Sequence, residues 1–151
     1  MNIVRALNRR AAFSIVPRHA APLQRRNCTA YAGEIRKVTG EELEVALANR
    51  EKPMIVDFYA DWCGPCVLLA KELEQVAQEL GDSVQILKVD TEIEKALASQ
   101  LRIQGLPTMI FIGMDPEKPA LRTEGLLPAN SIKDIVLNEL MEPAAPAESG
   151  A

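Results

Sequence analysis

The sequence predicts an α/β protein in which a central mixed β-sheet is flanked by helices on both faces. Three observations lead to this prediction. Apolar runs that favour strands alternate with segments whose apolar residues recur at helical spacing. The order strand, helix, strand near the middle of the chain is that of a parallel βαβ unit, which is joined right-handedly. Two strands that follow each other closely before the last helix form a hairpin, which makes the sheet mixed.

The first predicted helix begins after Thr39. This residue and Glu42, three positions later, form the signature of a capping box, and the helix is expected to end near Asn49. The run Ile-Val-Asp-Phe-Tyr-Ala at 55–60 is almost continuously apolar or β-favouring. Such a run is typical of a strand that is covered on both faces, and Asp57 is the one residue that breaks it.

The remaining elements follow from periodicity and from turn residues. A second capping signature, Thr91 with Glu94, is expected to open the helix after the second strand. Pro128 suits the start of the last helix, because proline fits the first helical turn. The predicted segments are a helix over 63–80 ended by Gly81, a strand over 84–89, a helix over 96–101, a strand over 109–112, a turn-rich connection over 115–119, a returning hairpin strand over 121–126 and a helix over 128–140.

The first 30 residues have the composition of a leader. They contain six arginines and no acidic residue, and all 21 acidic residues begin at Glu34. This composition is typical of a mitochondrial or chloroplast transit peptide, whereas the apolar runs are too short for a secretory signal. The alternative is a basic arm that the protein retains. We expect a transit peptide over 1–30, one globular domain over 31–141 and a disordered tail over 142–151.

The body of the chain is acidic. Six of the 17 basic residues lie in the leader, so residues 31–151 carry 11 basic and 21 acidic residues, a formal charge of −10. Because phosphate binding requires a basic patch, this charge argues against direct contact with nucleic acid. No apolar run approaches the roughly 18 residues that a membrane-spanning helix requires.

The cysteines point to redox chemistry. Cys28 lies in the leader with the only histidine, which leaves Cys63 and Cys66, in C-x-x-C spacing, as the cysteines of the domain. A single C-x-x-C beside a βαβ pattern is typical of thiol–disulfide exchange. A zinc site is a poor alternative, because zinc takes four ligands and only two cysteines are at hand. We therefore expect no metal, and no cofactor other than a redox-active disulfide.

The two cysteines are predicted to differ in role. A thiol at a helix N-terminus ionises readily, because it faces free amide donors and the positive end of the helix dipole, and the thiolate is the nucleophile. Cys63 has that position and is expected to be the more acidic and the more exposed. Cys66, one turn further, is placed to attack the mixed disulfide and release the target. Gly64 lets a target backbone approach, and Pro65 fixes φ at the helix start.

Two motifs resemble those of thioredoxins. Residues 56–66 read V-D-F-Y-A-D-W-C-G-P-C, and residues 105–108 read G-L-P-T. They are similar to the active-site segment and the cis-proline loop of that family, and the resemblance covers roughly residues 34–141. It implies the thioredoxin fold and protein-disulfide reductase activity on target proteins, with a thioredoxin reductase as electron donor.

The resemblance also implies roles for single residues. Trp62 would flank and shield the disulfide, and Gly64 and Pro65 would favour a reducing dithiol. Pro107 would be cis and lie against the disulfide, and the backbone of Leu106 would pair with the target segment. From the residues alone, Trp62 fits a place in the core equally well, and Pro107 fits an ordinary loop.

Asp57 is a carboxylate in a strand that is predicted to be buried. An unpaired charge is costly there, and burial raises the pKa of a carboxyl group. The alternative is an edge or bent strand that leaves Asp57 in contact with water. In thioredoxins the matching aspartate accepts the proton of the second cysteine, and the resemblance implies that role for Asp57.

Within that family the sequence resembles the plastid thioredoxin z, or CITRX, type. Residues 102–108 read R-I-Q-G-L-P-T and precede a lengthened segment over 114–127, and E-G-L stands at 124–126 where thioredoxins usually have V-G-A. This resemblance implies the chloroplast stroma rather than the mitochondrial matrix, and a role in plastid gene expression. The implied partners are fructokinase-like proteins and the plastid-encoded RNA polymerase complex. The alternative is a mainly structural subunit of that complex with a dispensable dithiol.

Overall fold

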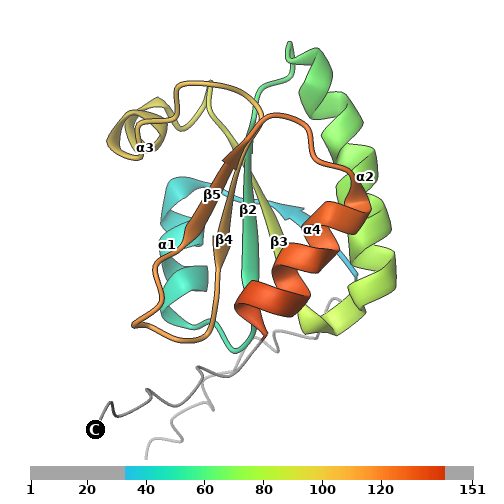
Figure 1. The fold of residues 1–151 in the computed structure, drawn as a ribbon. Helices are drawn as coiled ribbons and strands as arrows, with labels where there is room; N and C mark the ends of the chain where they lie inside the picture. The colour runs from blue at the N-terminus through green and yellow to red at the C-terminus, as the bar shows by residue number, and fades with distance from the viewer. Residues whose placement is uncertain (1–32, 142–151) are drawn as a thin grey trace, which may run out of the picture.

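The computed structural model describes residues 33–141 (Figure 1). The predicted leader over 1–30 and tail over 142–151 lie outside the described residues. No helix of the described part is both long enough and apolar enough to cross a membrane. The elements are β1 (Ile35–Lys37), α1 (Gly40–Ala48), β2 (Met54–Tyr59), α2 (Gly64–Leu80), a 3-10 turn (Gly81–Ser83), β3 (Gln85–Asp90), α3 (Lys95–Gln100), β4 (Thr108–Ile112), β5 (Leu121–Glu124), α4 (Ala129–Ile135) and a π-helical turn (Val136–Leu140).

The strands form one mixed five-stranded sheet in the order β1-β3-β2-β4-β5. β1 and β2 run parallel to β3, whereas β4 runs antiparallel to β2 and β5 antiparallel to β4. β2 is therefore central, and its Asp57 lies opposite Lys88 of β3 and Met109 of β4. The predicted mixed sheet with helices on both faces is confirmed.

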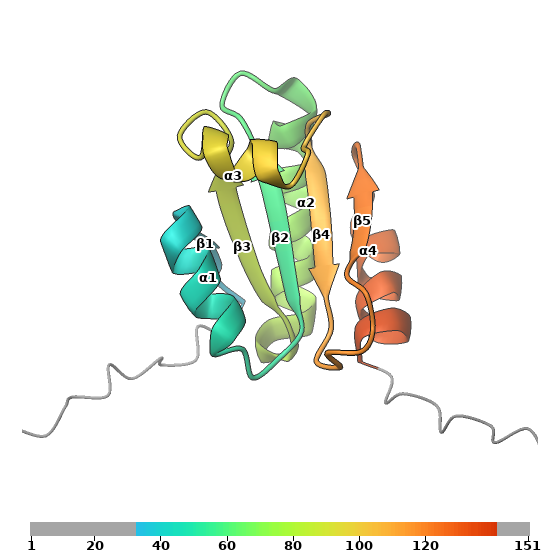
Figure 2. The same ribbon diagram turned by 90° about the vertical axis from the view of Figure 1, so that its left-hand side faces the viewer.

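The helices form a layer on each face of the sheet. Figures 1 and 2 show α1 and α3 on one face and α2 with α4 on the other. Side chains alternate between the faces along β2, so Ile55 joins the core beneath α2 and α4, and Val56 joins the core beneath α1 and α3. Each face therefore has its own apolar core, and the sheet separates the two.

Local signals set the helix boundaries that matter for the site. Thr39 and Glu42 form the predicted capping box at the start of α1, which ends at Ala48. α2 ends at Gly81, whose φ of 52° is a backbone conformation that favours glycine. α2 is amphipathic, and the side chains that it buries lie on one stripe: Cys66, Leu69, Leu73, Val76 and Ala77.

Four details differ from the prediction. β1 was not predicted, because three residues of which two are charged carry no periodic signal. The capping box at Thr91 is wrong: its hydroxyl donates to the carbonyl of Tyr59, and α3 begins at Lys95 without a side-chain cap. β5 ends at Glu124 rather than at residue 126, since Gly125 turns the chain with a φ of 90°. The last helix widens into a π-helical turn over its final five residues.

Candidate active site

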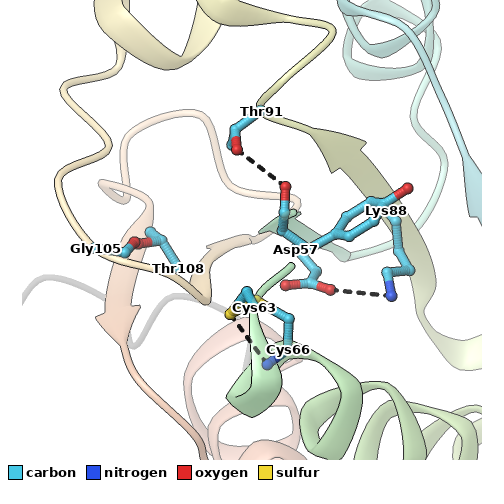
Figure 3. Close-up of a disulfide and its surroundings, with 8 residues drawn as sticks. Asp57, Cys63, Cys66, Lys88, Thr91, Gly105 and Thr108 are labelled. Carbon is cyan, nitrogen blue, oxygen red and sulfur yellow. Dashed lines mark hydrogen bonds and ion pairs between the residues drawn. A yellow bond between two sulfur atoms is a disulfide. The ribbon is translucent and has the colours of Figure 1, made fainter. Parts of the chain in front are cut away.

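Cys63 and Cys66 form a disulfide at the start of α2, with their Cα atoms 5.3 Å apart. Cys63 is the N-cap of the helix, and its Sγ accepts a hydrogen bond from the backbone N–H of Cys66 at 3.3 Å (Figure 3). An amide donor that points at the sulfur stabilises a negative charge on it. The helix start thus favours ionisation of Cys63 once the disulfide is reduced.

The two cysteines are covered to the same degree in the disulfide form. Cys63 is 4% exposed and Cys66 is 3% exposed, so the expected greater exposure of Cys63 is not seen. The reason is a small apolar cluster in which Tyr59 and Ala60 surround both sulfurs and Leu106 packs against them. Tyr59, Ala60 and Leu106 thus help to cover the disulfide.

The residues beside the cysteines leave an open surface. Trp62 is 71% exposed, so the alternative that it belongs to the core is wrong. A Cβ atom added to Gly64 would meet no atom within 4 Å, so the space over this glycine is free for another chain. Pro65 occupies the first turn of α2, where its missing N–H costs no helical hydrogen bond.

The loop before β4 brings a second segment to the disulfide. The Leu106–Pro107 peptide bond is cis, and Leu106 packs against the cysteine cluster. Thr108, the first residue of β4, is buried and donates from its Oγ1 to the carbonyl of Gly105 at 2.6 Å (Figure 3). The cis bond agrees with the resemblance, and Pro107 directly follows the residue that contacts the cysteine cluster; its own contact with the disulfide stays a prediction.

Asp57 is a fully buried carboxylate behind the disulfide. Its exposure is 0% and β2 is the central strand, so the alternative of an edge or bent strand that leaves Asp57 in contact with water is wrong. Neither carboxylate oxygen has a hydrogen-bond partner, and the nearest cation is Nζ of Lys88, 3.6 Å from Oδ2 (Figure 3). Burial raises the pKa of Asp57 to about 6, and the positive charge of Lys88 offsets part of that rise. The group can therefore exchange a proton near neutral pH.

Two functional neighbours were missed from the sequence. Lys88 pairs with Asp57, and its Nζ lies 4.4 Å from the ring centroid of Tyr59, within the range of a cation–π contact. Lys37 of β1 lies 5.2 Å from the same ring. A charged residue among the apolar residues Ile86, Leu87 and Val89 of the predicted strand over 84–89 was the available signal for Lys88. Lys37 had no such signal, because β1 itself was not predicted.

The described residues provide no metal centre. Among residues 33–141, no group of three or more His, Cys, Asp or Glu side chains could hold a metal ion. The side chains of the site itself offer two sulfurs that can exchange electrons in pairs and one carboxyl that can exchange a proton.

Comparison with known proteins places this site in a family. The family model described as thioredoxin matches residues 34–138. The chain is 48% identical over 107 residues to the thioredoxin-like protein CITRX, chloroplastic, of Arabidopsis thaliana, a match that covers 70% of this chain and 58% of that protein. The protein of the same name in Oryza sativa subsp. indica is 49% identical over 107 residues, covering 70% and 57%. The chain thus spans a little less than three fifths of the length of these relatives, both of which are chloroplastic.

A solved structure supports the same assignment. The crystal structure of chloroplastic thioredoxin z, described as defining a novel type-specific target recognition, has a TM-score of 0.67 and 55% sequence identity to the chain. The match covers 68% of this chain and 91% of that one. The chain carrying the Cys63–Cys66 disulfide at the start of α2 belongs to the thioredoxin family.

Proposed function

We propose that the protein is a thioredoxin-type protein-disulfide reductase of the chloroplast. The observation that carries the proposal is the Cys63–Cys66 disulfide at the N-terminus of α2, with an amide donor on the Cys63 sulfur. The cis-Pro107 loop on one side and buried Asp57 on the other support it. No cofactor takes part in the proposed reaction.

The reaction proceeds in two exchanges. In the reduced protein, the Cys63 thiolate attacks one sulfur of the target disulfide, which forms a mixed disulfide and releases the other target sulfur as a thiolate. The Cys66 thiol then loses its proton and attacks the Cys63 sulfur. The Cys63–Cys66 disulfide forms, and the second target thiolate leaves. Two electrons have passed to the target, and a thioredoxin reductase returns the protein to its dithiol.

Asp57 serves as the proton acceptor of the second exchange. Its carboxyl has a pKa of about 6, so it is largely ionised at the pH of a neutral or mildly alkaline compartment. A buried carboxylate with no hydrogen-bond partner gains from accepting a proton, because protonation removes a charge whose burial is costly and which Lys88 offsets only in part. Lys88 keeps the pKa from rising further.

The surface beside the disulfide receives the target. The backbone of Leu106 pairs with an extended target segment, and cis-Pro107 holds that backbone in place. The open space over Gly64 admits the target's main chain, Pro65 fixes the start of α2, and Trp62 shields the mixed disulfide. Such recognition relies on main-chain contacts and reads little of the target's sequence.

An insulin reduction assay with the full chain tests the proposal. Reduced wild type is expected to reduce insulin disulfides with multiple turnovers in the presence of dithiothreitol, and Cys63→Ser is expected to abolish turnover. Cys66→Ser is expected to accumulate a mixed disulfide with the target, since the resolving thiol is missing. Cys28→Ser is the matched control, because it removes the third cysteine of the chain and leaves C-x-x-C intact. A Cys63→Ser chain that turns over as wild type does would refute the assigned roles.

The leader and the partners belong to the same proposal. Residues 1–30 are a chloroplast transit peptide, and the mature domain acts in the stroma on fructokinase-like proteins and the plastid-encoded RNA polymerase complex, where it regulates plastid gene expression. The chloroplastic relatives support this setting. A fusion of residues 1–30 to a fluorescent protein is expected to enter isolated chloroplasts. Import into mitochondria alone would contradict it.

A second candidate function, a structural subunit of the polymerase complex, is favoured by the surface of the β4–β5 region. Met114, Leu121 and Leu126 are between 37% and 45% exposed there, although the thiol chemistry requires none of them. The Cys63→Ser, Cys66→Ser double variant separates the two functions. If it restores assembly of the complex and growth fully in a depleted plant line, the structural role suffices. A failure to restore growth despite normal assembly supports the reductase.

A further inference from the structure

The segment that leads from α3 to β4 has an unusual start. Residues 101–107, here called the docking loop, carry Leu106 to the cysteine cluster. Its second residue, Arg102, has a φ of 53°. This left-handed conformation is the usual one after a helix, but glycine normally adopts it, because a side chain makes it unfavourable. Backbone hydrogen bonds from Arg102 to Ser99 and from Ile103 to Ala98 close this turn, and a further contact on its carbonyls would hold the start of the docking loop in place.

Arg122 of the edge strand β5 supplies that contact. Its Nη1 donates to the carbonyl of Leu101 and its Nη2 to the carbonyl of Arg102, both at 2.8 Å. The last carbonyls of a helix have no partner within the helix, and the planar guanidinium group can donate to two acceptors at once. A side chain 20 residues further along the chain thus caps α3 and fixes the start of the docking loop.

Glu124 holds the Arg122 side chain in this orientation. Its Oε1 accepts from the same Nη2 at 2.9 Å, and its Oε2 lies 3.7 Å from the position that a Cβ atom on Gly105 would take. The ion pair therefore lies along the docking loop. Both side chains are partly exposed, 33% for Arg122 and 52% for Glu124, so the pair acts through geometry rather than through a strong charge interaction.

β5 also fixes the far end of the docking loop. The backbone N–H of Gly125 donates to the carbonyl of Pro107 at 2.8 Å. Leu106, the residue that packs against Cys63 and Cys66, lies in the chain between Pro107, which makes this contact, and the two carbonyls that Arg122 binds. The position of its backbone is thus set by one edge strand at both ends of the loop.

We infer that Arg122 is a positioning residue for target docking: by holding the carbonyls of Leu101 and Arg102, it fixes the docking loop so that the backbone of Leu106 is ready to pair with a target segment beside the disulfide. The inference rests on the proposed reductase function. Arg122 does not take part in sulfur chemistry, and its loss acts on target binding rather than on the exchange itself. A loop that must be ordered at each binding event weakens binding, because the ordering costs entropy.

The test uses the full chain and a matched arginine. Arg50 also donates to two backbone carbonyls, those of Leu47 and Gly113, but it joins the end of α1 to the end of β4, away from the start of α2 (Figure 1). For insulin reduction, Arg122→Ala is expected to raise KM about three- to tenfold and to leave kcat within about twofold. Arg122→Lys, which retains a cation at the position, is expected to be intermediate. Arg50→Ala is expected to leave KM unchanged.

Two further measurements separate positioning from general stability. The redox potential of the disulfide is expected to be the same in Arg122→Ala and wild type. Amide hydrogen exchange of Ile103, whose N–H donates to the carbonyl of Ala98, is expected to speed up about tenfold or more in Arg122→Ala, with unchanged protection in β2. Arg50→Ala is expected to leave Ile103 protected.

The outcomes distinguish this inference from the proposed function. A wild-type chain that does not reduce insulin refutes the proposed function. An Arg122→Ala chain with unchanged KM, or with a rise that Arg50→Ala matches, overturns the inference while the proposed function stands. If Arg122→Ala loses its fold, which exchange throughout β2 would reveal, Arg122→Lys decides: unchanged KM and Ile103 protection overturn the inference, and a raised KM at unchanged potential supports it.

Discussion

The first and second halves of β2 are buried to the same extent and carry different chemistry. Met54, Ile55 and Val56 are apolar, and they join the cores on the two faces of the sheet. Asp57 lies on the same face as Ile55, two residues on, and both have an exposure of 0%. Ile55 is surrounded by apolar side chains, whereas Asp57 faces Lys88 with two oxygens that lack a hydrogen-bond partner.

This difference shows how one strand can serve both stability and chemistry. Burial of an isoleucine contributes favourable transfer and packing free energy, whereas burial of a carboxylate costs free energy and raises its pKa. Burial gives Asp57 a pKa of about 6, so we expect this one residue of the second half of β2 to lower stability in return for reactivity. Substitutions of Ile55 and of Asp57 should therefore move stability in opposite directions.

The largest effect on stability is expected from the first half. Ile55→Ala removes a side chain from the core beneath α2 and α4 and leaves a cavity. We expect the free energy of unfolding to fall by about 2–5 kcal/mol, as measured by urea denaturation. The molecules that remain folded should reduce insulin at the wild-type rate. A selective loss of activity at unchanged stability would contradict the division of β2 into two roles.

Asp57→Asn is expected to raise the free energy of unfolding, whereas Ile55→Ala lowers it. The folded-state pKa of about 6 lies above the value of about 3.9 in the unfolded chain, so the folded state binds more protons between these pH values. Wild-type stability should therefore fall as pH rises through about 4 to 6 and level off above pH 7. Asn carries no charge, so the variant should be more stable by about 2 kcal/mol at pH 8 and nearly equal to wild type at pH 4.

Denaturant titrations at pH 8 and pH 4 check the expected direction of this stability change. Turnover of insulin by Asp57→Asn should be slower than by wild type, because the proton acceptor is gone. Glu79 offers a matched control. It also forms a pair with a lysine, Lys133, but it lies at the surface on α2, and Lys133 lowers its pKa. Glu79→Gln should not stabilise the protein at pH 8. A destabilised Asp57→Asn would refute the account of Asp57 as a costly buried charge.

Lys88→Gln tests the ion pair between Lys88 of β3 and Asp57 of β2. Removal of the cation takes away the interaction that lowers the pKa of Asp57, so this pKa should rise above its value of about 6. The pH profile of insulin reduction should shift upward with it. Lys37→Gln is the control, since Lys37 contacts the same Tyr59 ring but forms no ion pair with Asp57. An equal shift in both variants would contradict a specific role for Lys88.

The smallest effect on stability is expected at the start of α1. Thr39→Ala removes the side chain that accepts from the N–H of Glu42 in the capping box of α1. Stability should fall by about 1 kcal/mol, and turnover and its pH profile should not change. Thr39→Ser keeps the hydroxyl and should restore most of the loss. A change in the activity of Thr39→Ala would contradict the expectation that stability can be lowered without an effect on the chemistry at the disulfide.

Much of the fold could be predicted because its signals are local. The capping box at Thr39, the glycine at 81 and the apolar run over 55–60 each depend on neighbours in the chain. Where a side chain bonds to a residue distant in the chain instead of to its neighbours, the prediction was wrong. The hydroxyl of Thr91 bonds to Tyr59, 32 residues away, instead of capping α3. β1 forms because it pairs with the edge of β3, and its three residues carry no periodic pattern from which a strand could be predicted.

The site divides in the same way. The pattern W-C-G-P-C after an apolar strand placed Cys63 at a helix start, and the burial of Asp57 followed from its position within that strand. Lys88 was missed, because its place opposite Asp57 depends on the register between β2 and β3. Arg122 was missed as well, since its partners lie at the end of α3 and are brought near only by the pairing of β4 with β5.

The sequence by itself determined the order of strands and helices from α1 onward, the C-x-x-C pair at the start of a long helix and one acidic residue inside a buried strand. These depend on backbone propensity, capping and periodicity over a few residues. Tertiary structure alone decided which cation faces Asp57, which side chains cover the disulfide and which strand edge holds the docking loop. Many of these contacts join residues that are distant in the chain, and they form only when strand register fixes the side chains on a common face.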